Sequence, residues 1–98
     1  MQVEITAEAE RNLVDIALRI AADDTQNAVE FAARLRIACE GLSEFPERFS
    51  LVPRFEHLGI RHRVVGNYLI FYRVQGLQVL VLHVLHGAMD YGDLLGTE

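Results

Sequence analysis

The sequence predicts an α+β domain: an N-terminal strand, then an antiparallel helical hairpin packed on a mainly antiparallel four-stranded sheet, in the order β-α-α-β-β-β. Two observations carry this prediction. Residues 13–42 repeat apolar side chains at helical spacing, whereas residues 60–85 form runs of β-branched and aromatic residues divided by Gly-containing pairs. The 98 residues correspond to one domain, residues 1–98, and 51% of them are apolar, which allows a core without disulfides or metal.

The N-terminal segment predicts a short strand followed by a helix. Gln2–Ile5 alternates polar and apolar residues, as a half-buried strand does. Thr6 is a favourable N-cap, and Glu8 and Glu10 follow where the helix dipole favours negative charge. The helix carries one apolar stripe, formed by Leu13, Ile16, Ala17, Ile20 and Ala21.

A second helix follows the break at Asp23-Asp24-Thr25, and this segment offers the next N-cap. The short link predicts an antiparallel hairpin. The helix should end near Phe45, because a residue before proline disfavours the α conformation. Residues 46–58 then form an irregular connection that either packs over the core or carries function. The apolar stripe of the second helix comprises Ala28, Phe31, Ala32, Leu35, Ala38, Cys39 and Leu42.

The meander has two turns, Gly66-Asn67 and Gln75-Gly76. Two-residue turns place Val65 opposite Tyr68 and Val74 opposite Leu77, which fixes two faces that are both largely apolar. One face carries Arg61, Arg63, Val65, Tyr68, Ile70, Tyr72, Val79, Val81, His83 and Leu85. The other carries Ile60, His62, Val64, Leu69, Phe71, Arg73, Leu80, Leu82, Val84 and His86.

Two helices can cover only one face of such a sheet, so we expect an open apolar face that serves as an interaction site. The alternative is that the irregular connection and the C-terminal segment fold over the second face. Within that C-terminal segment, residues 90–95 can form one helical turn.

Charge and cysteine content narrow the class of protein. The net charge is −5, with ten acids against five arginines in residues 1–50, which disfavours general nucleic-acid binding. Cys39 is the only cysteine and fits a reducing compartment, and no apolar run is long enough to span a bilayer. We expect a cytoplasmic protein. His83 and His86 should point to opposite faces of their strand, so no metal site is expected.

Three motifs then stand in a characteristic order. The second helix closes with Leu42-Ser43-Glu44-Phe45-Pro46, the sheet runs from Arg61-His62-Arg63 through Tyr68 to Tyr72-Arg73-Val74, and the last strand ends Val84-Leu85-His86-Gly87-Ala88-Met89-Asp90. From Val3 to about Leu95 the chain resembles the ParE/RelE superfamily of type II toxin–antitoxin toxins, in particular the ParE (plasmid stabilisation) branch. The resemblance implies an α+β toxin neutralised by a cognate antitoxin, with no cofactor.

Two targets divide this superfamily. ParE-like members act on DNA gyrase and are not known as nucleases, whereas RelE-like members cut messenger RNA on the ribosome. RelE-like members carry an arginine where this chain has Leu69, and the ParE-like arginine before Asp90 is replaced by Met89. The resemblance therefore implies a gyrase-inhibiting toxin without catalytic residues. Two alternatives remain: a degenerate, non-toxic antitoxin-binding member, and a RelE-like endoribonuclease that would use Arg61, Arg63, Arg73, His86 and Tyr91.

The predicted binding residues come from the face that the family leaves open. They are expected to contact the antitoxin or the target, with no membrane and no direct nucleic-acid contact in the gyrase interpretation. A homodimer stays open. The predicted set is Leu69, Phe71, Arg73, Leu80, Leu82, Val84 and His86.

Overall fold

The computed structural model describes residues 1–96, and it confirms the predicted fold class. A strand and two helices come first, then an irregular connection, a three-stranded meander and a short C-terminal helix. The strands are β1 (Gln2–Ile5), β2 (Arg61–Val65), β3 (Tyr68–Gln75) and β4 (Gln78–His86), and the α-helices are α1 (Ala7–Ala21), α2 (Thr25–Glu40) and α3 (Gly92–Gly96). Single 3₁₀ turns occupy Gly41–Ser43, Pro46–Arg48 and Glu56–Leu58.

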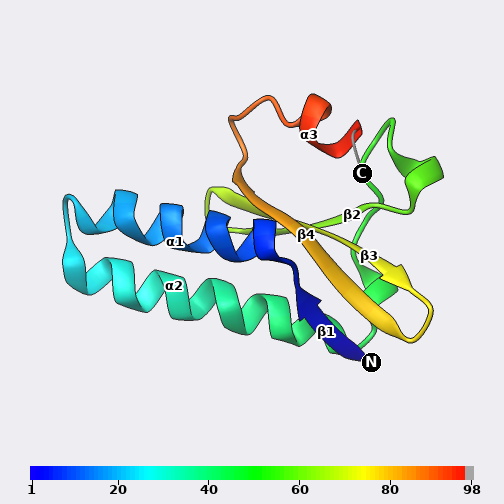
Figure 1. The fold of residues 1–98 in the computed structure, drawn as a ribbon, viewed down its shortest axis with the longest axis horizontal. Coiled ribbons are helices and arrows are strands. Elements are labelled where there is room, and N and C mark those ends of the chain that lie inside the picture. Colours follow the sequence, from blue (N-terminus) through cyan, green and yellow to red (C-terminus); the bar gives the residue numbers. More distant parts are fainter. Residues whose placement is uncertain (97–98) are drawn as a thin grey trace.

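The four strands form one mixed sheet in the order β1-β4-β3-β2 (Figure 1). β2, β3 and β4 are antiparallel neighbours, and β1 lies parallel to β4 at the sheet edge. The sequence left the edge that β1 joins undecided. The register pairs Gln2 with Gln78 and Ile5 with Val81, so β1 covers only the first half of the outer edge of β4.

Both helices begin at the predicted caps. The Thr6 hydroxyl accepts a hydrogen bond from the Ala9 amide at 3.2 Å, and the Asp24 carboxylate accepts one from the Asn27 amide at 3.1 Å. The prediction for the end of the second helix is wrong, because α2 ends at Glu40 and not near Phe45. Phe45 takes a left-handed conformation with φ 48°, so the chain has already left the helix before Pro46.

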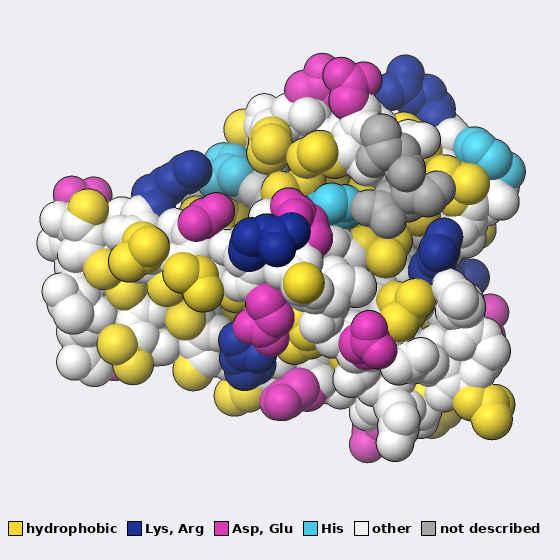
Figure 2. Space-filling model, viewed as in Figure 1, with side chains coloured by type: hydrophobic (Ala, Val, Ile, Leu, Met, Phe, Trp, Pro, Cys, Tyr) yellow, Lys and Arg dark blue, Asp and Glu magenta, His cyan; other side chains and the backbone are white. Residues whose placement is uncertain are grey.

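The larger core lies between the helical hairpin and one face of the sheet. Leu35 and Cys39 from α2 and Ile70, Tyr72 and Val81 from the sheet are fully buried there. The hairpin also extends beyond the sheet (Figure 1), and Figure 2 shows hydrophobic side chains gathered along both helices toward its tip. Apolar side chains exposed on these helices include Val14, Leu18 and Val29.

A second core covers the opposite face, and here the expectation of an open apolar face is wrong. Val52 of the connection and Leu95 of α3 pack with Phe71, Leu82 and Leu85 of the sheet, and all five are buried. Figure 1 shows the sheet lying between the helical hairpin and these two segments. The alternative expectation therefore holds, because the chain's own connection and C-terminal segment supply the apolar side chains that the two helices cannot.

A β-bulge explains why part of the predicted face assignment is wrong. Val65 pairs with Tyr68 as predicted, but Gln75 pairs with Gln78, and the register shifts again beside Phe71 and Tyr72. One extra residue in a strand reverses the side chains beyond it. The predicted faces hold from Val79 to Leu82 and are reversed at His83, Val84, Leu85 and His86.

Candidate functional site

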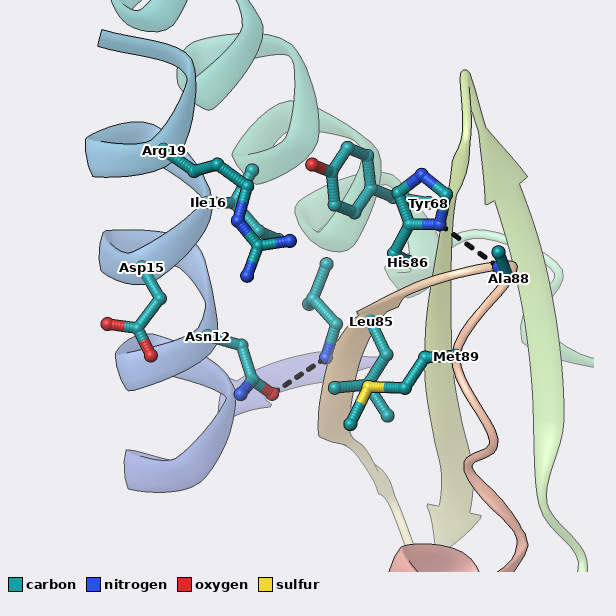
Figure 3. A pocket seen from close by; sticks show the side chains of 10 residues that line it. Asn12, Asp15, Ile16, Arg19, Tyr68, Leu85, His86, Ala88 and Met89 are labelled. Carbon is teal, nitrogen blue, oxygen red and sulfur yellow. Dashed lines mark hydrogen bonds between the residues drawn. The ribbon is translucent and has the colours of Figure 1, made fainter. Parts of the chain in front are cut away.

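An open groove of about 560 Å³ lies between α1 and the end of β4 (Figure 3). It forms where β4 continues past the end of β1, so that the helix rather than a strand faces the strand edge. Polar and charged side chains alternate with apolar ones around it. The lining residues are Asn12, Asp15, Ile16, Arg19, Tyr68, Val84, Leu85, His86, Ala88 and Met89.

Two side-chain hydrogen bonds fix α1 against β4. The Thr6 hydroxyl donates to the Val81 carbonyl at 2.8 Å, and the Asn12 side-chain oxygen accepts from the Val84 amide at 3.0 Å. Because β1 pairs with β4 only as far as Val81, Asn12 takes the place of a strand partner for the Val84 amide. The wall of the groove is therefore held rigidly by the backbone of β4.

His86 stands at the mouth of the groove with one ring nitrogen already occupied. Its Nδ1 accepts a hydrogen bond from the Ala88 amide at 3.0 Å. Its ring packs edge-on against the Tyr68 ring, with the ring centroids 5.2 Å apart and an interplanar angle of 78°. Since Nδ1 is an acceptor, the neutral ring carries its hydrogen on Nε2. His86 therefore offers an N–H donor at Nε2.

Arg19 and Asp15 are the charged groups of the groove, and both are exposed on α1. Neither forms an ion pair with another residue in the range 1–96. Figure 3 shows the Arg19 guanidinium reaching over Ile16 toward the side where Tyr68 and His86 lie. The groove thus presents unpaired charge beside the apolar side chains of Ile16 and Leu85.

The basic residues of the nuclease alternative are used in holding the fold together. Arg61 Nη1 donates to the Phe49 carbonyl at 2.7 Å and to the Glu47 carbonyl at 3.1 Å. Arg63 Nη1 donates to the Ala38 carbonyl at 2.9 Å, and its guanidinium lies 5.1 Å from the centre of the Phe49 ring. These two arginines attach the connection and the end of α2 to β2.

The other three residues of that set lie apart. Arg73 pairs with Leu80 on the face opposite the helices, and Tyr91 packs on Phe71 with ring centres 4.8 Å apart on that same face. His86 pairs with Tyr68 on the helix side. The structure therefore does not bring Arg61, Arg63, Arg73, His86 and Tyr91 into one site.

Two further chemistries can be assessed from the described side chains. No group of three or more His, Cys, Asp or Glu residues within the described chain could hold a metal ion. Cys39 is fully buried, and this burial raises the pKa of its thiol to about 11, so the thiolate that a nucleophile requires is disfavoured.

The predicted binding residues are divided between the two faces and do not form one surface. Phe71 and Leu82 are buried in the second core, while Leu69, Arg73 and Leu80 are half-buried on that face. The placement of Val84 and His86 on the same face is corrected by the bulge, because both line the groove beside α1. Their role in binding stays a prediction.

Sequence reasoning missed the residues that α1 contributes to the groove. Asn12, Asp15 and Arg19 recur at helical spacing along one side of the predicted apolar stripe. That polar row could have indicated a functional side of the helix. Nothing in the sequence showed that β4 extends past the end of β1 beside it. No helix within residues 1–96 has the length and apolar character needed to cross a membrane.

Comparisons with known proteins agree with this architecture. The family model described as the ParE toxin of the type II toxin–antitoxin system parDE matches residues 3–91. The chromosomal ParDE system of P. aeruginosa is similar over 88% of this chain and 95% of that chain, with TM-score 0.77 and 17% identity. The toxin–antitoxin complex RelBE2 of Mycobacterium tuberculosis is 31% identical, with TM-score 0.56, over 87% of this chain and 95% of that one. No curated protein matches.

Proposed function

The chain belongs to the ParE toxin family and is the toxin of a type II toxin–antitoxin system, and from this premise we propose that it binds and inhibits DNA gyrase. A cognate antitoxin neutralises it. The proposal places it in the cytoplasm, where gyrase acts, and assigns it no cofactor. The two solved structures described above belong to toxin–antitoxin systems, which supports the antitoxin as a partner.

The observation that supports binding over RNA cleavage is the separation of the basic residues. Cleavage requires groups that activate the 2′-hydroxyl, stabilise the charged phosphorane and protonate the leaving oxygen at one place. Arg61 and Arg63 are instead hydrogen-bonded to backbone carbonyls, and Arg73 and His86 lie on opposite faces of the sheet. This separation of the basic residues supports inhibition by binding rather than by RNA cleavage.

A RelE-like, ribosome-dependent endoribonuclease is the second candidate. One observation favours it, namely that the chain shares 31% identity with the RelBE2 complex, more than with the ParDE system. Against it stands Leu69, at the position where RelE-like members carry arginine.

The deciding experiment compares two reactions with one preparation of the full chain. Supercoiling of relaxed plasmid by gyrase is measured with increasing toxin, and translation-coupled cleavage of a reporter messenger RNA is measured in parallel. We expect supercoiling to stop, messenger RNA to stay intact, and the antitoxin to restore supercoiling. A type I topoisomerase, which should be unaffected, is the control.

Two results would overturn the proposal. Full supercoiling at excess toxin together with cleaved messenger RNA would establish the endoribonuclease. Full supercoiling with intact messenger RNA would identify a non-toxic member of the family, a result that the departures at Leu69 and Met89 would then explain.

A further inference from the structure

The groove between α1 and β4 contains donors that its own chain leaves unused. Arg19 forms no ion pair with residues 1–96, and the hydrogen bond at His86 Nδ1 leaves Nε2–H as the free donor of that ring. Figure 3 shows Arg19 and His86 on opposite walls of the same groove, with the Tyr68 ring next to His86. A guanidinium and an imidazole N–H facing one space form a binding site for an anionic oxygen group.

Apolar side chains also line the groove. Ile16 on α1 and Val84 and Leu85 on β4 are at least nine-tenths buried, whereas Met89 has 46% of its surface exposed. A flexible thioether side chain adapts to apolar partners of different shapes. The groove therefore suits a ligand that presents a carboxylate next to an apolar side chain.

The charge around the groove selects between kinds of anion. Arg19 is its only arginine, and Asp15 lies one helical turn away on the same helix. A polyphosphate backbone carries a charge at every nucleotide and requires several cations, whereas one carboxylate requires one. Asp15 in turn can accept an N–H or a cation of the ligand, which fixes the direction of a bound peptide.

We propose that this groove binds a segment of the antitoxin in which an acidic side chain, held by Arg19 and His86, stands beside an apolar side chain that packs on the exposed Met89. The inference rests on the proposed neutralisation by an antitoxin and is independent of the gyrase target. It names the chemistry of the partner, an acidic and apolar peptide, at a groove of about 560 Å³, a volume typical of ligand sites.

The test uses the antitoxin encoded beside the toxin gene and overlapping peptides that span it, with affinity measured by calorimetry. Arg19→Ala should weaken binding about 10- to 100-fold, as expected when a charge-assisted hydrogen bond is lost. Arg11→Ala is the matched control on the same helix, because Arg11 lies outside the groove and should change affinity less than about threefold. Thermal unfolding of each variant verifies that it is folded.

A charge swap makes the test specific. Arg19→Glu should abolish binding, and replacing the responsible acid of the antitoxin with arginine should restore it. Equal affinities for Arg19→Ala and Arg11→Ala, or peptides that bind equally well after their acids become amides, would overturn the inference. An RNA oligonucleotide that competes with the antitoxin in an Arg19-dependent way would also overturn it, because the groove would then be a phosphate site. If the wild-type chain did not bind its antitoxin at all, both this inference and the proposed neutralisation by the antitoxin would be wrong.

Discussion

Arg61 and Arg63 illustrate how a charged residue on a strand can be mistaken for a reacting group. Each guanidinium donates to a backbone carbonyl, that of Phe49 for Arg61 and that of Ala38, in the last turn of α2, for Arg63. The hydroxyl of Tyr72 does the same for the carbonyl of Pro46. Arg61 and Tyr72 thereby hold the irregular connection against the sheet, and Arg63 holds the end of α2.

Arg63→Ala should lower the free energy of unfolding by about 1–3 kcal/mol, because a charge-assisted hydrogen bond and the stacking on Phe49 are both lost. Chemical denaturation measures the change. Arg11→Ala removes an exposed ion pair with Glu8 and should change stability by less than about 1 kcal/mol. An Arg63→Ala chain of unchanged stability that has lost toxicity would instead indicate a residue that contacts the target.

At the scale of the elements, a bidentate ion pair joins the two helices of the hairpin. Arg36 of α2 donates to both carboxylate oxygens of Glu10 of α1, at 2.8 and 3.0 Å. This hydrogen bond lowers the pKa of Glu10 from its usual 4.5. The two residues are far apart in sequence, so the pair fixes the hairpin alignment close to the sheet.

The lowered pKa makes a prediction about acid stability. A carboxyl with a depressed pKa in the folded state stabilises the fold above its unfolded pKa and loses that contribution as the pH falls through the folded value. Glu10→Gln should therefore reduce the dependence of stability on pH below about 4.5, where the unfolded carboxyl titrates. Both side chains are over 40% exposed, so the effect is a few tenths of a kcal/mol to about 1 kcal/mol. Thermal unfolding of the wild-type protein and the Glu10→Gln variant from pH 3 to 7 measures this effect. An identical change of stability with pH in the two proteins would contradict the prediction.

The elements were predictable because each carries a local signal. Thr6 and Asp24 cap helices, Gly66 and Gly76 take positive φ in the turns, and periodicity separates helix from strand. The bulge in β4 was not predictable, because Val79 to Leu85 are apolar apart from His83 and either register would bury apolar side chains. As a result Val84 and His86 were assigned to the wrong face, and the groove that they line was missed.

At the scale of the whole molecule, the sheet separates two cores. The helices cover one side, while the connection and α3 cover the other with side chains such as Val52 and Leu95. The sequence predicts that an apolar strand face must be covered. It does not predict whether a partner protein or a segment of the same chain covers that face, because an irregular connection has no periodicity from which its position could be inferred. The open face expected from sequence is therefore closed by the chain itself.

Leu95→Ala tests whether α3 keeps the second core closed in solution. Leu95 is fully buried, so the substitution should cost about 2–4 kcal/mol and increase the fluorescence of a dye that binds exposed apolar surface. Leu77→Ala is the matched control, because Leu77 is 87% exposed and its loss should cost under about 0.5 kcal/mol. Equal behaviour of the two variants would mean that α3 does not cover the sheet.

The pairing of β1 with β4 has a consequence for how the protein is made. Gln2 meets its partner Gln78 only after β4 has left the ribosome, and β4 is the last of the four described strands to be synthesised. Contacts between such distant positions delay folding. The sheet therefore cannot be completed while β4 is still inside the ribosome, however early β1 and the two helices emerge.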